Sequence, residues 1–377
     1  MKQKTRMMVV ALALALLMVL AACSAPAKTE TTSEKAPETT AEAVKPAENA
    51  TEPAAEAGED YEWPEMTIIV AHPAVTTDVR QAGWEFAAEH LSNLTGGKIV
   101  LDIYPAGQLG TTRETTEATA TGAIQMSQNP PANIEPFAPT LGIMNIPYLL
   151  PSNYEDGKAV LKGPAGEALL ESISNNSSGL KGIAIWDALY NCYTSNVDFR
   201  KTEDLSGQKI RIMSSAISEQ AIKSWGGTAI VMDLSEVYTA LQTGAIDGQE
   251  SGIGAGTYSN KYYEVQKYLY QFNSVRGAFI TIVNEAWWNG LDTKVQDAIT
   301  ESLAAGEAHY DELRLAREQE ALDTMSQYLE IIDLTPEQET KLKEAAQPSC
   351  QEVYLQTTGD AGKALLDIFA QENAKYN

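Results

Sequence analysis

The stretch from Gly207 to Ser251, GQKIRIMSSAISEQAIKSWGGTAIVMDLSEVYTALQTGAIDGQES, decides the fold. Its first segment, residues 209–213, alternates like a strand, with two isoleucines on one face and Arg211 on the other. Its last segment, residues 245–251, predicts a second short strand.

The segment between these strands, residues 232–244, follows the pattern of a helix. Asp233 or Ser235 caps its start, and Glu236 stands three residues after Asp233 as in a capping box. Gly244 supplies the left-handed stop. An apolar stripe lies along one side of the helix: Val237, Ala240 and Leu241. Strand, helix and strand form a βαβ unit, which places ligands beyond the carboxyl ends of its strands.

Arg211 is the first candidate site residue. A strand in a helix-covered sheet is buried on both faces, so a guanidinium there needs a partner. One interpretation is an internal ion pair with a carboxylate such as Asp233. The other is that the planar fork of the arginine holds a ligand carboxylate.

This chain resembles the substrate-binding subunit, of the DctP type, of tripartite ATP-independent periplasmic (TRAP) transporters. The resemblance covers roughly residues 66–377 and rests on several motifs in the family order. The motifs are TGGKI at 95–99, YPAGQLG at 104–110, GQKIRI at 207–212, SEVYTALQTGAIDGQE at 235–250 and YEVQKY at 263–268.

The resemblance implies an α/β, two-lobed fold of the periplasmic-binding-protein type II, with hinge strands between the lobes and a long helix spanning both. It implies a receptor, without cofactor, that clamps a small organic acid through Arg211 and delivers it to TRAP membrane permease subunits driven by an ion gradient. We expect a monomer. Two alternatives of another class stay open: an extracellular enzyme acting on a carboxylate, and a sensory receptor feeding a histidine kinase.

Further candidate ligand-binding residues follow from matching this chain to the family. Ser251 stands where the family usually has Asn, and Leu234 where many sialic-acid binders have Phe. Asn191 falls where several sugar-acid binders carry a second arginine. Gln128 and Asn129 lie at a strand end that commonly contacts the ligand. The remaining candidates are Met213, His72 and Trp186, the last being equally compatible with the core.

The number of cations in the site predicts how many carboxylates the ligand carries. With an asparagine at position 191, Arg211 is the single well-supported cation, and a second carboxylate without a cation is unfavourable when desolvated. We therefore expect a monocarboxylate with polar or aromatic substituents in preference to a symmetric C4-dicarboxylate. Lys209, His72 and Arg276 are the cations that would overturn this expectation.

The N-terminal region predicts export and lipid anchoring. Residues 1–22 have a basic start, an apolar run and small residues before Cys23, which resembles the lipobox of a lipoprotein signal peptide. Removing the leader changes the net charge from −24 to −27. Residues 23–63 form an acidic tether too poor in apolar residues to fold. About 38 such residues span roughly 35 Å as a flexible coil.

The remaining chain suits two lobes. The predicted divisions are lobe one at 64–188, lobe two at 189–277, a return to lobe one with the spanning helix at 278–318, and C-terminal helices on lobe two at 319–377. The two halves share a weak internal sequence similarity, because Thr121-Gly122-Ala123-Ile124 recurs as Thr243-Gly244-Ala245-Ile246. The residues after each isoleucine are expected to face one cleft.

Other chemistry is not supported. The acidic balance argues against nucleic acid, and three widely separated histidines leave no readable metal site. Residues 252–256, GIGAG, predict a flexible loop instead of a dinucleotide fingerprint. Cys192 and Cys350 are candidates for a disulfide in an exported chain, the ordinary alternative being two buried thiols.

Overall fold

The computed structural model describes residues 61–376 except 178, 199 and 201–204. Tyr61–Asn377 forms one compact unit. The predicted signal peptide, the lipidation site Cys23 and most of the tether lie outside the described residues.

The first half of the sheet contains three parallel strands. β1 (Met66–Ala71) pairs with β2 (Ile99–Tyr104) on one side and β3 (Met126–Asn129) on the other. Helices α1 (Val79–Leu94) and α2 (Thr112–Thr121) connect them. Asp78 caps α1, and Gly122 ends α2 with a φ of 80°.

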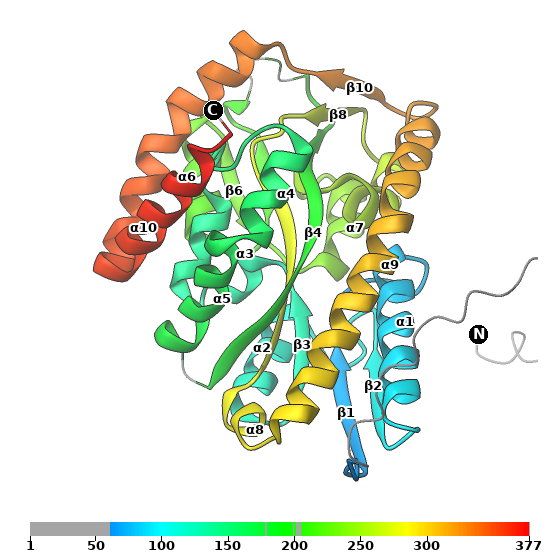
Figure 1. Ribbon diagram of the computed structural model, residues 1–377. Coiled ribbons are helices and arrows are strands. Elements are labelled where there is room, and N and C mark those ends of the chain that lie inside the picture. The colour runs from blue at the N-terminus through cyan, green and yellow to red at the C-terminus, as the bar shows by residue number, and fades with distance from the viewer. Residues whose placement is uncertain (1–60, 178, 199, 201–204, 377) are drawn as a thin grey trace, which may run out of the picture. The chain divides into compact units, whose positions relative to one another are not determined.

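Two long antiparallel strands cross the middle of the molecule (Figure 1). β4 (Leu180–Ser195) pairs with β9 (Arg276–Asn284), which in turn pairs with β3. Beyond Tyr190, β4 pairs with β7 (Gly248–Gly252) and β8 (Tyr268–Gln271) instead. With β5 (Lys209–Ile212) and β6 (Thr228–Val231), the strand order is β2-β1-β3-β9-β4-β7-β5-β6, and this crossing joins the two halves of the sheet.

The second half contains the unit around Arg211. β5 (Lys209–Ile212) lies parallel to β7, and α7 (Leu234–Thr243) precedes β7, as predicted. The simple strand–helix–strand prediction is incomplete, because α6 (Ala216–Ser224) and β6 (Thr228–Val231) intervene. β6 pairs with β5 on the side away from β7 and forms the edge.

The remaining elements lie outside this strand order. Residues 131–176, for which no pattern was assigned, form α3 (Pro131–Ile134), the 3₁₀ segment η1 (Pro139–Asn145), α4 (Tyr154–Lys162) and α5 (Pro164–Asn176). The π-helical segment η3 (Ile253–Tyr258), the 3₁₀ turn η4 (Tyr262–Glu264), α8 (Glu285–Asn289) and β10 (Glu330–Asp333) complete them.

Two long helices bind the halves together. α9 (Thr293–Met325) packs its first half on α1 and β1, while Ala321 and Met325 pack with Cys192 and Leu269 near its end. α10 (Pro336–Asn373) contacts α6, α5 and η1. It begins with Pro336 and bends at Gly359. The residue bounds of the lobes remain predictions.

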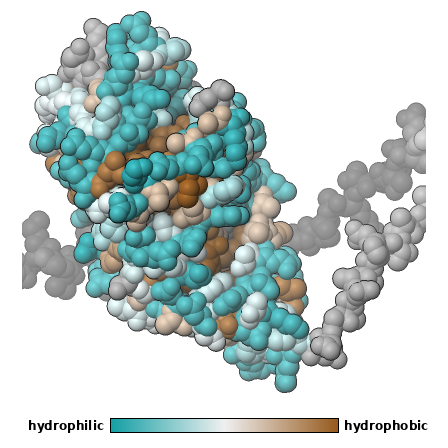
Figure 2. All heavy atoms as spheres, turned by 60° about the vertical axis from the view of Figure 1, so that its left-hand side comes forward, coloured by the Kyte–Doolittle hydropathy of each residue, from teal (hydrophilic) through white to brown (hydrophobic). Residues whose placement is uncertain are grey.

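The surface is mainly polar. Figure 2 shows hydrophilic side chains over most of the visible face, with hydrophobic ones in the recesses between them. Among the described residues, no helix has the length and apolar character needed to span a membrane.

Candidate ligand-binding site

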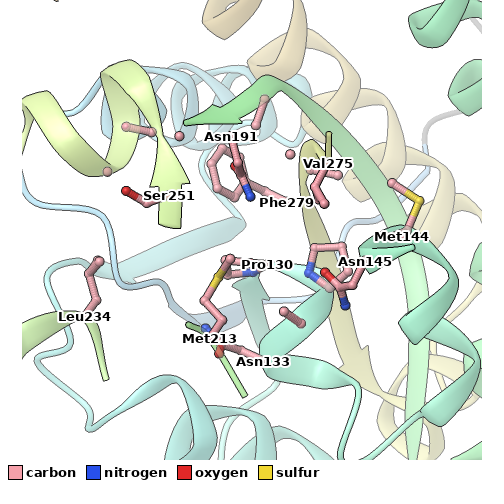
Figure 3. Close-up of a pocket in the computed structure, with 18 of the residues that line it drawn as sticks. Pro130, Asn133, Met144, Asn145, Asn191, Met213, Leu234, Ser251, Val275 and Phe279 are labelled. Atoms are coloured by element: carbon pink, nitrogen blue, oxygen red, sulfur yellow. The ribbon is translucent and has the colours of Figure 1, made fainter. Parts of the chain in front are cut away.

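A pocket lies where the crossing strands, the end of β5 and the segment after β3 meet (Figure 3). Of the predicted site residues, five line it: Asn191, Arg211, Met213, Leu234 and Ser251. Apolar residues form much of the wall: Pro73, Pro130, Pro131, Ala132, Met144, Ala188, Val275, Ala278 and Phe279. Thus residues from both halves of the sheet surround one space.

Two backbone carbonyl oxygens hold the guanidinium of Arg211 in place. Arg211 is 2 % exposed, and its Nε and Nη1 donate to the carbonyl oxygens of Met232 (3.0 Å) and Glu250 (3.2 Å). No carboxylate of the described residues forms an ion pair with it, and its Nη2 makes no hydrogen bond with them. Burial lowers the pKa of Arg211, while nearby Tyr262, Glu250 and Asp233 oppose that shift. The guanidinium is therefore fixed in direction and has a donor left for a ligand.

Asp233 is not the ion-pair partner of Arg211 that one interpretation required. Its Oδ1 accepts from the backbone N–H of Ser235 and caps α7. Its Oδ2 accepts from the backbone N–H and Oγ1 of Thr112, at 3.4 and 3.3 Å. Because Thr112 and Leu234 both line the pocket, this carboxylate joins the starts of α2 and α7 at its rim.

Asn191 lies on β4 beside a buried carboxyl. Its Nδ2 donates to Glu250 Oε1 at 2.6 Å, and Glu250 is 1 % exposed. Burial raises the pKa of Glu250, whereas the hydrogen bond from Asn191 and the charge of Arg211 lower it. This contact orients the side-chain amide of Asn191. Its Nδ2 faces Glu250, and its Oδ1 therefore points away from Glu250.

Two arginines that the site prediction did not include also line the pocket. Arg80 is 3 % exposed, lies 3.8 Å over the ring of Phe279, and forms a two-pronged contact with Asp78 (both distances 3.4 Å). Arg276 donates its Nε and Nη2 to Asp187 at 2.7 and 2.8 Å. Each of these cations therefore has a carboxylate partner within the protein.

The Arg276 cluster extends away from the pocket. Arg314, on α9, donates to Asp187 (3.2 Å) and Asp311 (2.8 Å), and Lys158 also contacts Asp311 (2.6 Å). This network links β4, β9, α4 and α9 where the strands cross. The Arg276–Asp187 pair lies in the protein interior, with 0 % of either side chain exposed, whereas Lys158 and Asp311 are partly exposed.

Neutral polar groups complete the wall. Asn133 Oδ1 accepts from the backbone N–H of Ser214, and Asn145 Nδ2 donates to Glu135 Oε2 at 2.9 Å. Both lie in the segment after β3, for which the sequence offered no motif. Ser251 Oγ lies 3.2 Å from Thr257 Oγ1. The 252–256 stretch, predicted to be a flexible loop, begins the η3 π-helical turn, and Gly252, Ala255 and Gly256 line the pocket.

Four predicted site residues lie away from the pocket wall. Gln128 accepts from Trp84 Nε1 and donates to Thr281, and Asn129 donates to Thr116. The pocket is reached one residue later, at Pro130. Trp186 is fully buried between Trp84 and Tyr310, which fits its core interpretation.

His72 is the fourth of these residues. It is 2 % exposed and hydrogen-bonds Gln81 at 3.0 Å. Burial and the charge of Arg80 lower its pKa to about 3, so the ring is neutral and supplies no cation. Lys209, another cation considered from the sequence, is exposed and outside the pocket wall.

Neither a disulfide nor a metal cluster accompanies the site in the part of the chain that the structure describes. Cys192 and Cys350 are both free and buried in different clusters, which contradicts the disulfide candidate. No group of three or more metal-ligating side chains occurs among the described residues.

Comparison with known proteins identifies the family. The model of bacterial extracellular solute-binding proteins, family 7 (DctP), matches residues 70–357. The C4-dicarboxylate-binding periplasmic protein DctP of Rhodobacter capsulatus is 30 % identical over 286 residues, 75 % of this chain and 85 % of that protein.

Solved structures agree with this assignment. A TRAP periplasmic solute-binding protein from Desulfovibrio salexigens, with bound orotic acid, has a TM-score of 0.78 at 27 % identity and covers 82 % of this chain and 99 % of its own. One from Sulfurospirillum deleyianum, with bound succinate, has a TM-score of 0.73 at 26 % identity with the same coverage. The predicted two-lobed type II fold is thereby confirmed. The chain belongs to the DctP family of bacterial extracellular solute-binding proteins, the solute receptors of TRAP transporters, and is not an enzyme.

Proposed function

We propose that Arg211 binds the carboxylate of a small organic acid in the pocket, and that the loaded receptor delivers it to ion-gradient-driven TRAP permease subunits. The observation that carries the proposal is a buried guanidinium on the pocket wall that has no carboxylate partner among the described residues. A buried cation without a counter-charge is unfavourable, and a ligand carboxylate supplies that charge. The acids bound by the related receptors, orotate and succinate, support the same chemistry.

The receptor is proposed to act outside the cytoplasm as a monomer, anchored to the membrane by lipid on Cys23. Closure around the ligand would involve the crossing strands β4 and β9, because they connect the two halves that carry the pocket walls. Binding of an acid would thus be communicated to the permease by the shape of the receptor.

Calorimetry with two charge-matched variants tests the clamp, using the acid that native mass spectrometry detects on the purified protein. Arg211→Met is expected to weaken binding by about 2–5 kcal/mol, because it removes a charge-assisted contact in a desolvated site. Lys209→Met is the matched control, since it removes a cation from the same strand outside the pocket. An unchanged dissociation constant for folded Arg211→Met would contradict the proposal.

A further inference from the structure

Three arginines on the pocket wall at first suggest a ligand with several negative charges. The contacts of Arg276 exclude it from this role. Its Nε and Nη2 are both used by Asp187. Its Nη1 is buried without a partner and lies beside Gly157 on α4, where a Cβ added to that glycine would be 2.6 Å away. Because Gly157 is not part of the pocket wall, no nitrogen of Arg276 is left for a ligand.

Asp78 supplies the counter-charge for Arg80 at the pocket wall. Nε and Nη2 of Arg80 both contact Asp78, whose side chain is 1 % exposed, and the flat face of the guanidinium covers Phe279. The Arg80–Asp78 pair is therefore neutral overall. Its Nη1 makes no hydrogen bond with the described residues and suits a neutral acceptor.

Arg211 can neutralise one negative charge on a ligand. Arg211 is one cation, and it donates to the backbone oxygen of Glu250, whose buried carboxyl bonds to Asn191, so the pocket around Arg211 holds at most one uncompensated positive charge. The other polar groups on the wall are neutral: Thr112, Asn133, Asn145, Asn191 and Ser251. A second carboxylate would be desolvated here without a cation of its own.

The wall also presents a hydrogen-bond acceptor. Because Asn191 donates its Nδ2 to Glu250, its Oδ1 is turned toward two glycines of the pocket wall. A Cβ added to Gly277 would lie 3.1 Å from this oxygen, and one added to Gly252 would lie 4.0 Å from it. Oδ1 accepts no hydrogen bond from the described residues. An acceptor facing a pocket selects a ligand with an O–H or N–H donor.

We infer that this receptor takes a monocarboxylic acid whose apolar body carries a hydroxyl or N–H group, and that it discriminates against C4-dicarboxylates. The inference rests on the proposed function, with the carboxylate on Arg211. The donor group binds Asn191 Oδ1, and the apolar body contacts Phe279, Val275 and Met213. The ligand class thus differs from the one in the name of the Rhodobacter capsulatus relative.

Pairs of acids that differ by a methyl in place of a carboxylate test the charge argument by calorimetry. The pairs are 3-hydroxybutyrate with malate, butyrate with succinate, crotonate with fumarate, and 4-methylbenzoate with terephthalate. In each pair that binds, the monoacid is expected to bind at least tenfold more tightly. A dicarboxylate that binds equally well or better would overturn the inference but leave the organic-acid function standing. Absence of binding to all eight acids would contradict both.

Two variants isolate the groups responsible. Asp78→Asn keeps the helix cap of α1 but removes the counter-charge of Arg80, so the preference for 3-hydroxybutyrate over malate should shrink at least tenfold. Asn191→Leu removes the acceptor, so the preference for 3-hydroxybutyrate over butyrate should disappear. If Asp78→Asn leaves the first ratio unchanged, or Asn191→Leu the second, the assigned role of that residue is wrong.

Discussion

The close contact between helices α9 and α1 offers a sharp test of the fold, through the substitution Gly306→Ala. α9 meets α1 at two glycines, Gly306 and Gly83. A Cβ on Gly306 would lie 2.5 Å from the carbonyl oxygen of Gly83 and 2.7 Å from the Cβ of Ala87, where ordinary contact begins at 3.4 Å. Neither atom can rotate away, so the helices must separate by roughly 1 Å.

The expected cost combines two opposing contributions. Overpacking a well-packed interior costs about 1–3 kcal/mol, and the upper part of this range applies because the obstacles are a backbone atom and a Cβ. Alanine in place of glycine inside a helix recovers about 1 kcal/mol. The free energy of unfolding should therefore fall by about 1–2 kcal/mol, measured by urea denaturation.

A substitution in the same helix separates these contributions. Ala304 is exposed on α9, so Ala304→Gly should lose about 0.5–1 kcal/mol through helix propensity alone. If Gly306→Ala were as stable as the original protein, or more stable, the close approach of α9 to α1 would be refuted.

Three further predictions concern other parts of the chain. Burial raises the pKa of the Cys192 and Cys350 thiols to about 12, so both should react with a thiol reagent only after unfolding; reaction in the folded protein would contradict their burial. Burial raises the pKa of Glu135 to about 7, so the folded protein holds its proton more tightly than the unfolded chain, and the stability this provides is lost as pH rises from about 4.5 to about 7. Glu135→Gln should flatten that decline in urea titrations, and an unchanged slope would show that Glu135 does not titrate there. Cys23→Ser should move the protein from the membrane to the soluble fraction, because anchoring depends on acyl chains; retention after a salt wash would refute the lipobox.

Local signals predicted most of the elements near the site. Asp233 and Gly244 mark the ends of α7 through hydrogen bonds and backbone conformations that involve only neighbouring residues. Such signals can be recognised in a single sequence. The missed elements depend on distant partners. α6 packs its buried face on α10, and β6 is a half-exposed edge strand without clear alternation.

Three of the predicted site residues that line the pocket lie on strands. Arg211, Asn191 and Ser251 lie on β5, β4 and β7, and the family motifs give their positions. Gln128 and Asn129 do not line this pocket, because β3 continues to Asn129 and both side chains bond to residues of the interior.

Arg80 was not predicted for a different reason. In the sequence it reads as a residue in the first turn of α1. Its place on the pocket wall depends on its contact with Phe279, which lies on β9 far along the chain. No pattern near position 80 indicates that contact.

A crystal structure of the protein with its bound acid tests the central claim most directly. The carboxylate of the ligand is predicted to lie within about 3 Å of Arg211 Nη2, the nitrogen that makes no hydrogen bond with the described residues. A ligand carboxylate bound elsewhere in the pocket, with Arg211 contacting only Met232 and Glu250, would contradict the account.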